Sequence, residues 1–123
     1  MCSEPPPILL VENDPATAEL YSQTISQEFT VLICEREEQV IERLKDEKIS
    51  AVILEPALLG GRGWAILSTI QRELAAHPVP VILCSTSEDR RRGMEMGAAA
   101  FLVKPVLPTA LLGVLRKVVQ PGK

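Results

Sequence analysis

Polar side chains follow four short apolar runs of the sequence, at the point where each run ends. The residues are Glu12, Asn13 and Asp14 after ILLV, Glu55 after AVIL, Ser85 after VPVILC and Lys104 after AFLV. A buried ammonium is costly to desolvate unless a carboxylate is paired with it, and carboxylates also attract cations. Glu55 is long enough to reach Lys104. Such chemistry requires the four chain segments to meet at one place.

The apolar runs predict the element that brings them together. They occupy residues 8–11, 30–34, 51–54, 79–84 and 100–103. None alternates polar with apolar residues, so we expect every strand to be covered on both faces, as in a parallel sheet. Helical spacing of apolar residues lies between the runs and after the last one, and the predicted stripes are Leu20, Tyr21, Thr24 and Ile25; Val40, Ile41 and Leu44; Leu67, Ile70 and Leu74; and Leu111, Leu112, Leu115, Val118 and Val119.

These βα units predict an open α/β sandwich with right-handed crossovers. In such sheets the site lies beyond the carboxyl ends of the strands, where the polar residues are expected. Asp14 followed by Pro15 predicts the start of the first helix. Ser87 is predicted to cap the fourth helix and Gly97 to end it.

Composition restricts the class of protein. The chain has 123 residues, 46% hydrophobic and 24% charged, with a net charge of −3. We expect a flexible lead-in over residues 1–7, one domain over 8–119 and a tail over 120–123. The charge gives no general reason to bind nucleic acid or membrane, and no apolar stretch is long enough to span one. Cys2, Cys34 and Cys84 lack metal-binding spacing, which favours reduced thiols in a cytoplasmic protein.

Four segments resemble one known family in their order and spacing: LLVENDP, VILEPALLGGRG, PVILCST and GAAAFLVKP. From residue 8 to about residue 119 the chain resembles the receiver domain of bacterial two-component response regulators. The resemblance implies a flavodoxin-like (βα)5 three-layer sandwich with a parallel five-stranded sheet in the order 2-1-3-4-5. It also implies a phosphoryl-accepting Asp after the third strand and a bound Mg2+.

The family's functional positions can be assigned to residues of this chain. Glu55 falls at the phosphoacceptor position, and Ser85 and Lys104 fall where the phosphoryl oxygens are bound. Glu12, Asn13 and Asp14 form the acidic pocket, and Phe101 is at the position of the switch aromatic. The Mg2+ positions are Asn13, Glu55 and Ala57.

Two of these positions depart from the family pattern. Glu55 replaces Asp, and its extra methylene moves the carboxylate outward by about 1.5 Å. In-line phosphoryl transfer depends on alignment, and a misplacement near 1 Å can cost about a hundredfold in rate. Asn13 replaces an acidic residue and so removes a negative charge from a cation site. We therefore expect a pseudo-receiver with weak or no Mg2+ binding, in which Glu55 pairs with Lys104 and holds one conformation.

The predicted function is that of a signalling module that binds proteins, either a histidine kinase or another signalling protein, a second copy of itself or an output domain. The alternative is a working Mg2+-dependent phosphoacceptor that takes a phosphoryl group from a histidine kinase. A short fourth helix, with 12 residues from Ser85 to Gly97, argues against the dimer usual in the family. A nucleotide- or flavin-binding domain is disfavoured because ENDPAT lacks a glycine cluster. Hydrolase chemistry is disfavoured because His77 is the only histidine and no GxSxG is present.

Each assignment also has a purely structural interpretation. Lys104 could be paired with a carboxylate only to stabilise the fold, and Ser85 could be no more than a hydroxyl on the approach to a helix. Phe101 could be a core residue. The sequence leaves these alternatives open.

Overall fold

The computed structural model describes residues 6–57, 61–76 and 78–119. The expected tail, Cys2, His77 and most of the expected lead-in lie outside the described residues. Among the residues described, no helix is long and apolar enough to cross a membrane.

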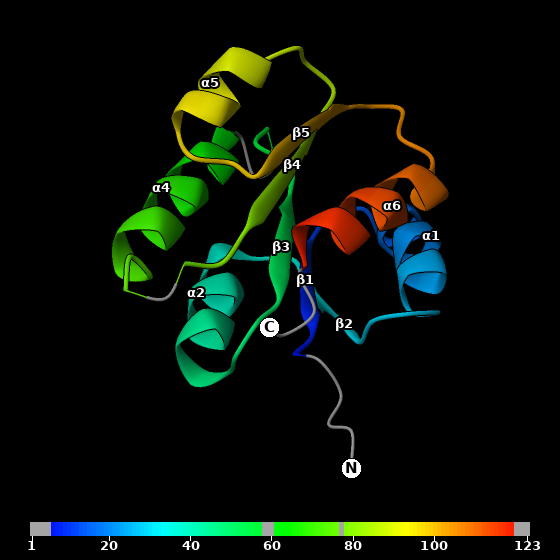
Figure 1. Cartoon of the computed structure of the whole chain (residues 1–123), viewed down its shortest axis with the longest axis horizontal. Coiled ribbons are helices and arrows are strands. Elements are labelled where there is room, and N and C mark those ends of the chain that lie inside the picture. Colours follow the sequence, from blue (N-terminus) through cyan, green and yellow to red (C-terminus); the bar gives the residue numbers. More distant parts are fainter. Residues whose placement is uncertain (1–5, 58–60, 77, 120–123) are drawn as a thin grey trace.

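A five-stranded parallel sheet forms the centre of the described structure (Figure 1). Its strands are β1 (Ile8–Val11), β2 (Val31–Cys34), β3 (Ala51–Leu54), β4 (Val81–Ser85) and β5 (Ala100–Val103). Their order is β2-β1-β3-β4-β5, which confirms the predicted flavodoxin-like topology. The predicted strand positions agree to within two residues at each end. The fourth strand ends one residue later than predicted, so Ser85 is itself part of β4.

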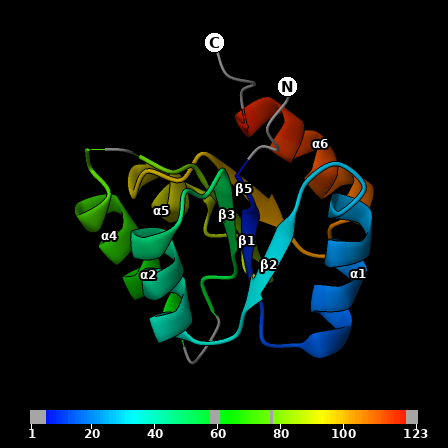
Figure 2. The ribbon, with the colours of Figure 1, turned by 90° about the horizontal axis from the view of Figure 1, so that it is seen from below.

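Helices cover both faces of this sheet. They are α1 (Pro15–Ile25), α2 (Glu37–Asp46), α4 (Gly63–Glu73), α5 (Arg90–Glu95) and α6 (Pro108–Val118). Helices α2, α4 and α5 lie on one side, and α1 and α6 lie on the other (Figure 2). The result is a three-layer sandwich.

The sheet separates two hydrophobic clusters. One joins Leu9, Val52 and Leu83 of the sheet to α2 and α4. The other joins Ile8, Ile53 and Ile82 to α1 and α6. Alternate residues of one strand thus belong to opposite clusters, which is why the central strands are apolar without interruption.

The expectation that every strand is covered on both faces is wrong for the two edge strands. Ile33 of β2 is 43% exposed and Val103 of β5 is 36% exposed. Each edge strand has a neighbour strand on one side only, which leaves part of its surface open to solvent. The placement of Leu20 in the first predicted apolar stripe is also wrong. Its side chain is 52% exposed on α1, whereas Tyr21 and Ile25 are buried.

The short fourth helix predicted from the sequence is α5. It begins later than a cap at Ser87 would place it. Its N-cap is Asp89, because the chain first makes a turn in which the Asp89 N–H donates to the Ser87 carbonyl. The helix ends as predicted at Gly97, whose φ is +94°. The N–H groups of Gly97 and Ala98 donate to the carbonyls of Met94 and Gly93, the Schellman arrangement that satisfies the last turn.

Gly93 lies inside α5, where glycine lowers helix propensity. A Cβ at this position would lie 2.8 Å from both Leu83 and Phe101 side-chain atoms. The absence of a side chain therefore lets the short helix approach β4 and β5 closely, and tertiary contact replaces helix length as the source of its stability.

Candidate functional site

Strand register brings the polar residues predicted from the sequence to one edge of the sheet. Val11 of β1 is paired with Leu54 of β3, so Glu12 and Glu55 follow the two strands at the same level. Ser85 is paired with Val103, the residue before Lys104. The Lys104 N–H also donates to the Ser85 carbonyl at 2.7 Å, which holds the lysine to the end of β4.

Lys104 lies between two buried carboxylates. Its Nζ is 3.1 Å from Glu55 Oε1 and 3.6 Å from Glu12 Oε1. The side chains of Lys104, Glu55 and Glu12 are 19%, 10% and 8% exposed. The ion pair expected between Glu55 and Lys104 is present. We call the three residues the carboxylate–lysine cluster.

The remaining carboxylate oxygens of this cluster accept backbone hydrogen bonds. Glu12 Oε2 accepts from the Asp14 N–H at 3.2 Å, and Glu55 Oε2 accepts from the Ala57 N–H at 3.1 Å. Each glutamate therefore uses one oxygen for the ammonium and one for the turn that follows its own strand. This double use fixes the direction of both side chains.

The charge balance of the cluster favours the protonated lysine. Burial by itself lowers the pKa of Lys104, but attraction to Glu12 and the hydrogen bond and charge of Glu55 outweigh it, and the pKa is raised above its ordinary value. The two carboxylates thus hold the ammonium more strongly than its desolvation opposes it. The sequence had placed Glu12 in an acidic pocket but had not identified it as the second partner of Lys104.

Ser85 is buried, with an exposed fraction of 2%. Its hydroxyl oxygen accepts a hydrogen bond from the Ser87 N–H at 3.1 Å. Ser85 is thus at the predicted edge, and its contact in the described structure is with its own loop.

Asn13 and Asp14 are exposed, unlike Glu12, the third member of the predicted acidic pocket. Asp14 is the N-cap of α1, as predicted, and its Oδ2 accepts from the Thr17 N–H at 3.1 Å and from the Thr17 hydroxyl. These hydrogen bonds, the one from the hydroxyl first, lower the pKa of Asp14. The carboxylate of Asp14 therefore caps the N-terminus of α1.

The glycines after Glu55 allow α4 to pack closely behind it. A Cβ at Gly63 would lie 2.5 Å from the Glu55 carbonyl oxygen and from Pro56 Cα. Gly61 has a φ of +93°, a conformation that other residues rarely adopt. Gly61 and Gly63 thus bring the first turn of α4 against the backbone of Glu55. The glycine cluster is visible in the sequence, but only the structure shows that α4 is the element that packs against Glu55.

Some of the residues at the predicted metal positions already form hydrogen bonds or an ion pair with other groups of the chain. The carbonyl of Ala57 accepts from the Gly61 N–H at 3.1 Å, and both oxygens of Glu55 have the partners given above. Within the described part of the chain, no group of three or more His, Cys, Asp and Glu residues is arranged to hold a metal ion.

The family model for the response regulator receiver domain matches residues 8–116 of this chain. The chain belongs to the response regulator receiver domain family. It is 35% identical over 115 residues to the transcriptional regulatory protein HprR of Escherichia coli, covering 89% of this chain and 49% of that protein. It is 26% identical over 117 residues to the phosphate regulon transcriptional regulatory protein PhoB of Klebsiella pneumoniae, covering 92% of this chain and 51% of that protein.

This receiver domain thus spans about half the length of the curated relatives it matches. Among solved structures, the non-phosphorylated HemR receiver domain of Leptospira biflexa is similar with a TM-score of 0.83 and 24% identity, covering 97% of this chain and 98% of that one. At this identity the likeness supports the fold alone.

The position of the switch aromatic in this receiver domain is occupied by a core residue. Phe101 is 5% exposed and belongs to the cluster beneath α2 and α4. The Arg90 guanidinium lies 5.7 Å from the centre of its ring. Arg92 likewise lies over the ring of Trp64 at 4.0 Å, which joins α5 to the start of α4. Two of the three consecutive arginines at residues 90–92 therefore pack on aromatic rings, although all three are exposed.

One pocket of the receiver domain lies beside the carboxylate–lysine cluster. It has a volume of about 410 Å3, and it is lined by Thr17, Leu20, Tyr21, Thr86, Lys104, Pro105 and Val106. The exposed Leu20 contributes its apolar side chain. This surface combines an apolar wall with the polar edge of the site.

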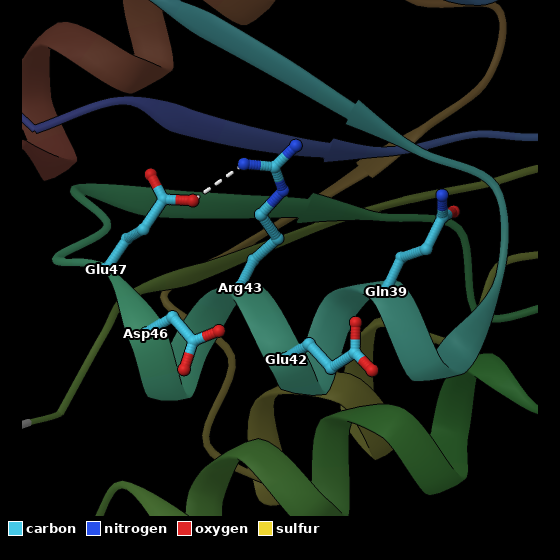
Figure 3. A pocket seen from close by; sticks show the side chains of 5 residues that line it. All are labelled: Gln39, Glu42, Arg43, Asp46 and Glu47. Atoms are coloured by element: carbon cyan, nitrogen blue, oxygen red, sulfur yellow. Dashed lines mark hydrogen bonds and ion pairs between the residues drawn. The ribbon is translucent and has the colours of Figure 1, made fainter.

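Another pocket, of about 260 Å3, lies on the solvent side of α2 (Figure 3). It is lined by Gln39, Glu42, Arg43, Asp46 and Glu47, and Arg43 pairs with Glu47 at 2.6 Å. The first four residues are on successive turns of α2 and Glu47 is its C-cap, and the Arg43–Glu47 pair has the i,i+4 spacing of ordinary helix surfaces. We interpret this pocket as the solvated face of α2.

Proposed function

We propose that this receiver domain is a signalling module of a two-component phosphorelay that is not phosphorylated in the usual way and acts through protein–protein interaction. The observation that carries the proposal is the contact of Glu55 with Lys104. In this chain the residue at the phosphoacceptor position neutralises the lysine without a phosphoryl group. The carboxylate–lysine cluster thus holds the site in one charge state.

The geometry of Glu55 supports the absence of phosphoryl transfer. A nucleophilic carboxylate needs an oxygen that can align with the phosphorus and the leaving group. Both oxygens of Glu55 are already directed, one at Lys104 and one at the Ala57 N–H. Reaction would require one of these contacts to break in a site where the side chain is 10% exposed.

The donor set does not fit a resident Mg2+ ion. Mg2+ takes oxygen ligands in near-octahedral geometry, usually one or two carboxylates with waters. At the three family positions this chain offers the Asn13 amide, a Glu55 carboxylate paired with an ammonium, and the Ala57 carbonyl that accepts from Gly61. We therefore derive no step of the function through a metal ion.

The surface beside the site supports a role in binding proteins. The pocket lined by Leu20, Tyr21 and Lys104 opens next to the cluster, and Leu107, at the start of α6, is 71% exposed. Apolar surface that is bordered by polar residues, as in this pocket, is typical of contact surfaces. The partner we propose is a histidine kinase or another signalling protein, a second copy of this chain or an output domain.

Treatment with a small phosphodonor tests the proposal. The protein is incubated with acetyl phosphate and Mg2+, and its intact mass is measured at short intervals because acyl phosphates hydrolyse. We expect no added phosphoryl group. A variant with Asn13→Asp and Glu55→Asp, which restores the family's residue types, serves as the matched control for the assay. A covalent phosphoryl group on Glu55 of the unmodified protein would instead establish the phosphoacceptor function.

A second experiment tests whether Glu55 holds one conformation. Glu55→Ala and Glu55→Asp shorten the side chain and break or lengthen its contact with Lys104. We expect both to change the amide resonances at Ser85 and Lys104 and the fluorescence of Trp64, whose helix packs on Glu55. Unchanged spectra and unchanged binding to an interacting protein would rule out the conformational role.

A further inference from the structure

Helix α5 is too short to be stable on its own. It has six residues, with Gly93 among them, and isolated helices of fewer than about 12 residues are marginal in water even for good helix formers. Contacts with other elements must therefore hold it in place. Besides the close approach of Gly93 to β4 and β5, side-chain contacts join α5 to α4, which lies on the same side of the sheet (Figure 2).

One contact is a stack between Trp64 and Arg92. The Arg92 guanidinium lies 4.0 Å from the centre of the Trp64 ring, closer than the 5.7 Å that separates Arg90 from the ring of Phe101. Tryptophan is also the best aromatic partner for a cation, so the stack on Trp64 is the stronger of the two. Trp64 is partly buried in the first turn of α4, the turn that lies against the Glu55 backbone.

The other contact joins the C-terminal ends of the two helices. The Gln71 side-chain amide donates to the carbonyl oxygens of Met96 at 3.1 Å and of Gly97 at 2.9 Å. These carbonyls lie where a helix leaves its last carbonyls without partners of its own. A Cβ at Gly97 would collide with the Gln71 amide, so the glycine makes room for the contact. Gln71 follows Trp64 by about two helical turns, which places both contacts on one face of α4.

We propose that the Trp64–Arg92 stack and the Gln71 amide, together the α4–α5 clamp, make the two helices move as one body, so that a displacement of α4 at Glu55 is passed to α5. A helix that is held at two separate points follows the helix that holds it. Arg92 and Gln71 are thus positioning residues for α5. The coupling holds whether or not Glu55 accepts a phosphoryl group, so it goes beyond the proposed function.

A competing route to α5 runs from β4 through the turn that joins Ser85 to Asp89. Residues 86–88 of this turn are exposed. The clamp instead uses residues that rest on the core, because Trp64 and Met96 both pack against the hydrophobic cluster beneath α4. A close-packed contact passes on a displacement that an exposed turn can absorb. The contacts therefore favour the clamp over the turn.

Amide hydrogen exchange tests whether the clamp holds α5. The variant with Arg92→Gln and Gln71→Ala removes both contacts and leaves Trp64 in place. The N–H groups of Gly93 and Met96 donate to the carbonyls of Asp89 and Arg92, so their exchange reports the order of α5. We expect their protection to fall at least about tenfold, because a short helix without its anchors opens locally.

Arg91→Gln provides the matched control. Arg91 pairs with Glu95 of the same helix at 3.4 Å, and both side chains are exposed. The substitution removes the same charge as Arg92→Gln from the neighbouring position but no contact with α4. We expect protection in α5 to change by less than about threefold, as for other exposed ion pairs. An equal loss in the control and the clamp variant would overturn the inference.

Displacement of α4 tests the coupling, which a merely structural role of the clamp would not produce. Gly63→Ala forces the first turn of α4 away from the Glu55 carbonyl, and the amide resonances of α5 report whether that helix follows. We expect Gly63→Ala to shift the α5 resonances in the protein with an intact clamp and not in the clamp variant. The α4 resonances should shift in both. In a Ser85→Ala background α5 should still follow.

The possible results separate the two routes. Equal shifts in α5 with and without the clamp, or no shift with the clamp intact, would overturn the inference. Loss of the shifts in the Ser85→Ala background would assign the coupling to the turn after β4 instead.

If Gly63→Ala does not fold, the Ile66 amide of α4, which donates to the Arg62 carbonyl, decides. Coupling between two elements is reciprocal, so removing the clamp should lower its protection together with that of α5. Unchanged protection of Ile66 would contradict movement as one body. These measurements contain no phosphodonor. A phosphoryl group on Glu55 would refute the proposed function and leave the clamp untouched, and failure of the clamp would leave the proposed function standing.

Discussion

At the scale of single residues, the stability of the site depends on how one ammonium is shared. Lys104 is closer to Glu55, at 3.1 Å, than to Glu12, at 3.6 Å, and it is mostly removed from water. Removing one partner of a buried ion pair is costly because the other charge stays buried. Here the second carboxylate limits that cost, so the two glutamates should be energetically coupled.

Glu55→Gln should therefore lower the free energy of unfolding by about 1–2 kcal/mol, and Glu12→Gln by less. The double variant should lose more than the sum of the two, since Lys104 then has neither carboxylate in its cluster. Urea denaturation of the four proteins at neutral pH measures this. Simple additivity would mean that Lys104 does not depend on sharing between the glutamates.

Cys84 gives the fold a dependence on alkaline pH. Burial raises the pKa of its thiol to about 12, from an ordinary value of 9.0, with Lys104 opposing the shift and Glu55 and Glu12 adding to it. Between these values the unfolded chain releases a proton that the folded chain keeps. Stability is therefore fully present below about pH 9 and should fall by up to about 1.4 kcal/mol per pH unit above it.

The measurement is the urea midpoint under reducing conditions at increasing pH. Burial also raises the pKa of Cys34, which acts in the same direction, so the informative quantity is a difference in slope. Cys84→Ala should show a shallower loss of stability than the unmodified protein. Parallel slopes would show that the Cys84 thiol titrates as it does in the unfolded chain.

At the scale of elements, the packing of α4 on the strand-end turn sets the position of Glu55. Gly63→Ala would place a Cβ 2.5 Å from the Glu55 carbonyl oxygen, so the helix or the turn has to move. We expect a loss of about 1–3 kcal/mol in stability, as for other overpacked positions, together with altered Trp64 fluorescence.

Gly113→Ala provides the matched control in α6. A Cβ at Gly113 meets nothing within 4 Å, so this substitution should stabilise the protein by about 0.5–1 kcal/mol through helix propensity alone. Thermal denaturation of both variants checks the pair. Equal effects of the same sign at the two positions would contradict the close approach of α4 to Glu55.

At the scale of the whole molecule, the sheet divides the core into two clusters that share no side chain. Ile70 of α4 lies in one and Ile25 of α1 in the other, and both are almost fully buried. Ile70→Val and Ile25→Val should each cost about 0.5–1.5 kcal/mol.

Because the two sites lie on opposite faces of the sheet, their costs should add to within about 0.5 kcal/mol in the double variant. Denaturant unfolding of the two single variants and the double variant provides the test. A large coupling between them would show that the two layers are not independent in packing.

Much of this architecture could be predicted because apolar runs and caps are local signals. The three strands 8–11, 51–54 and 100–103 were predicted at their observed bounds, and Asp14 and Gly97 were correctly assigned to helix ends. Ser87 was wrong as a cap because the chain first makes a turn, with the Asp89 N–H donating to the Ser87 carbonyl, so the helix begins only after Asp89. The assignment of Leu20 to the apolar stripe was wrong because helical spacing does not show which face of α1 the sheet leaves uncovered.

The sequence by itself determined the sheet, the edge at which polar side chains gather, and the two departures at Asn13 and Glu55. The sheet and its polar edge follow from chain-local patterns and from the rule that parallel strands end on the same side, and the two departures follow from the resemblance to the receiver family. Only the tertiary structure decided that Glu12 shares Lys104 with Glu55, that Asp14 is used by its helix, and that Gly63 brings α4 against the Glu55 backbone. Each of these depends on the distances between side chains and backbone after the layers have packed, which no spacing along the chain specifies.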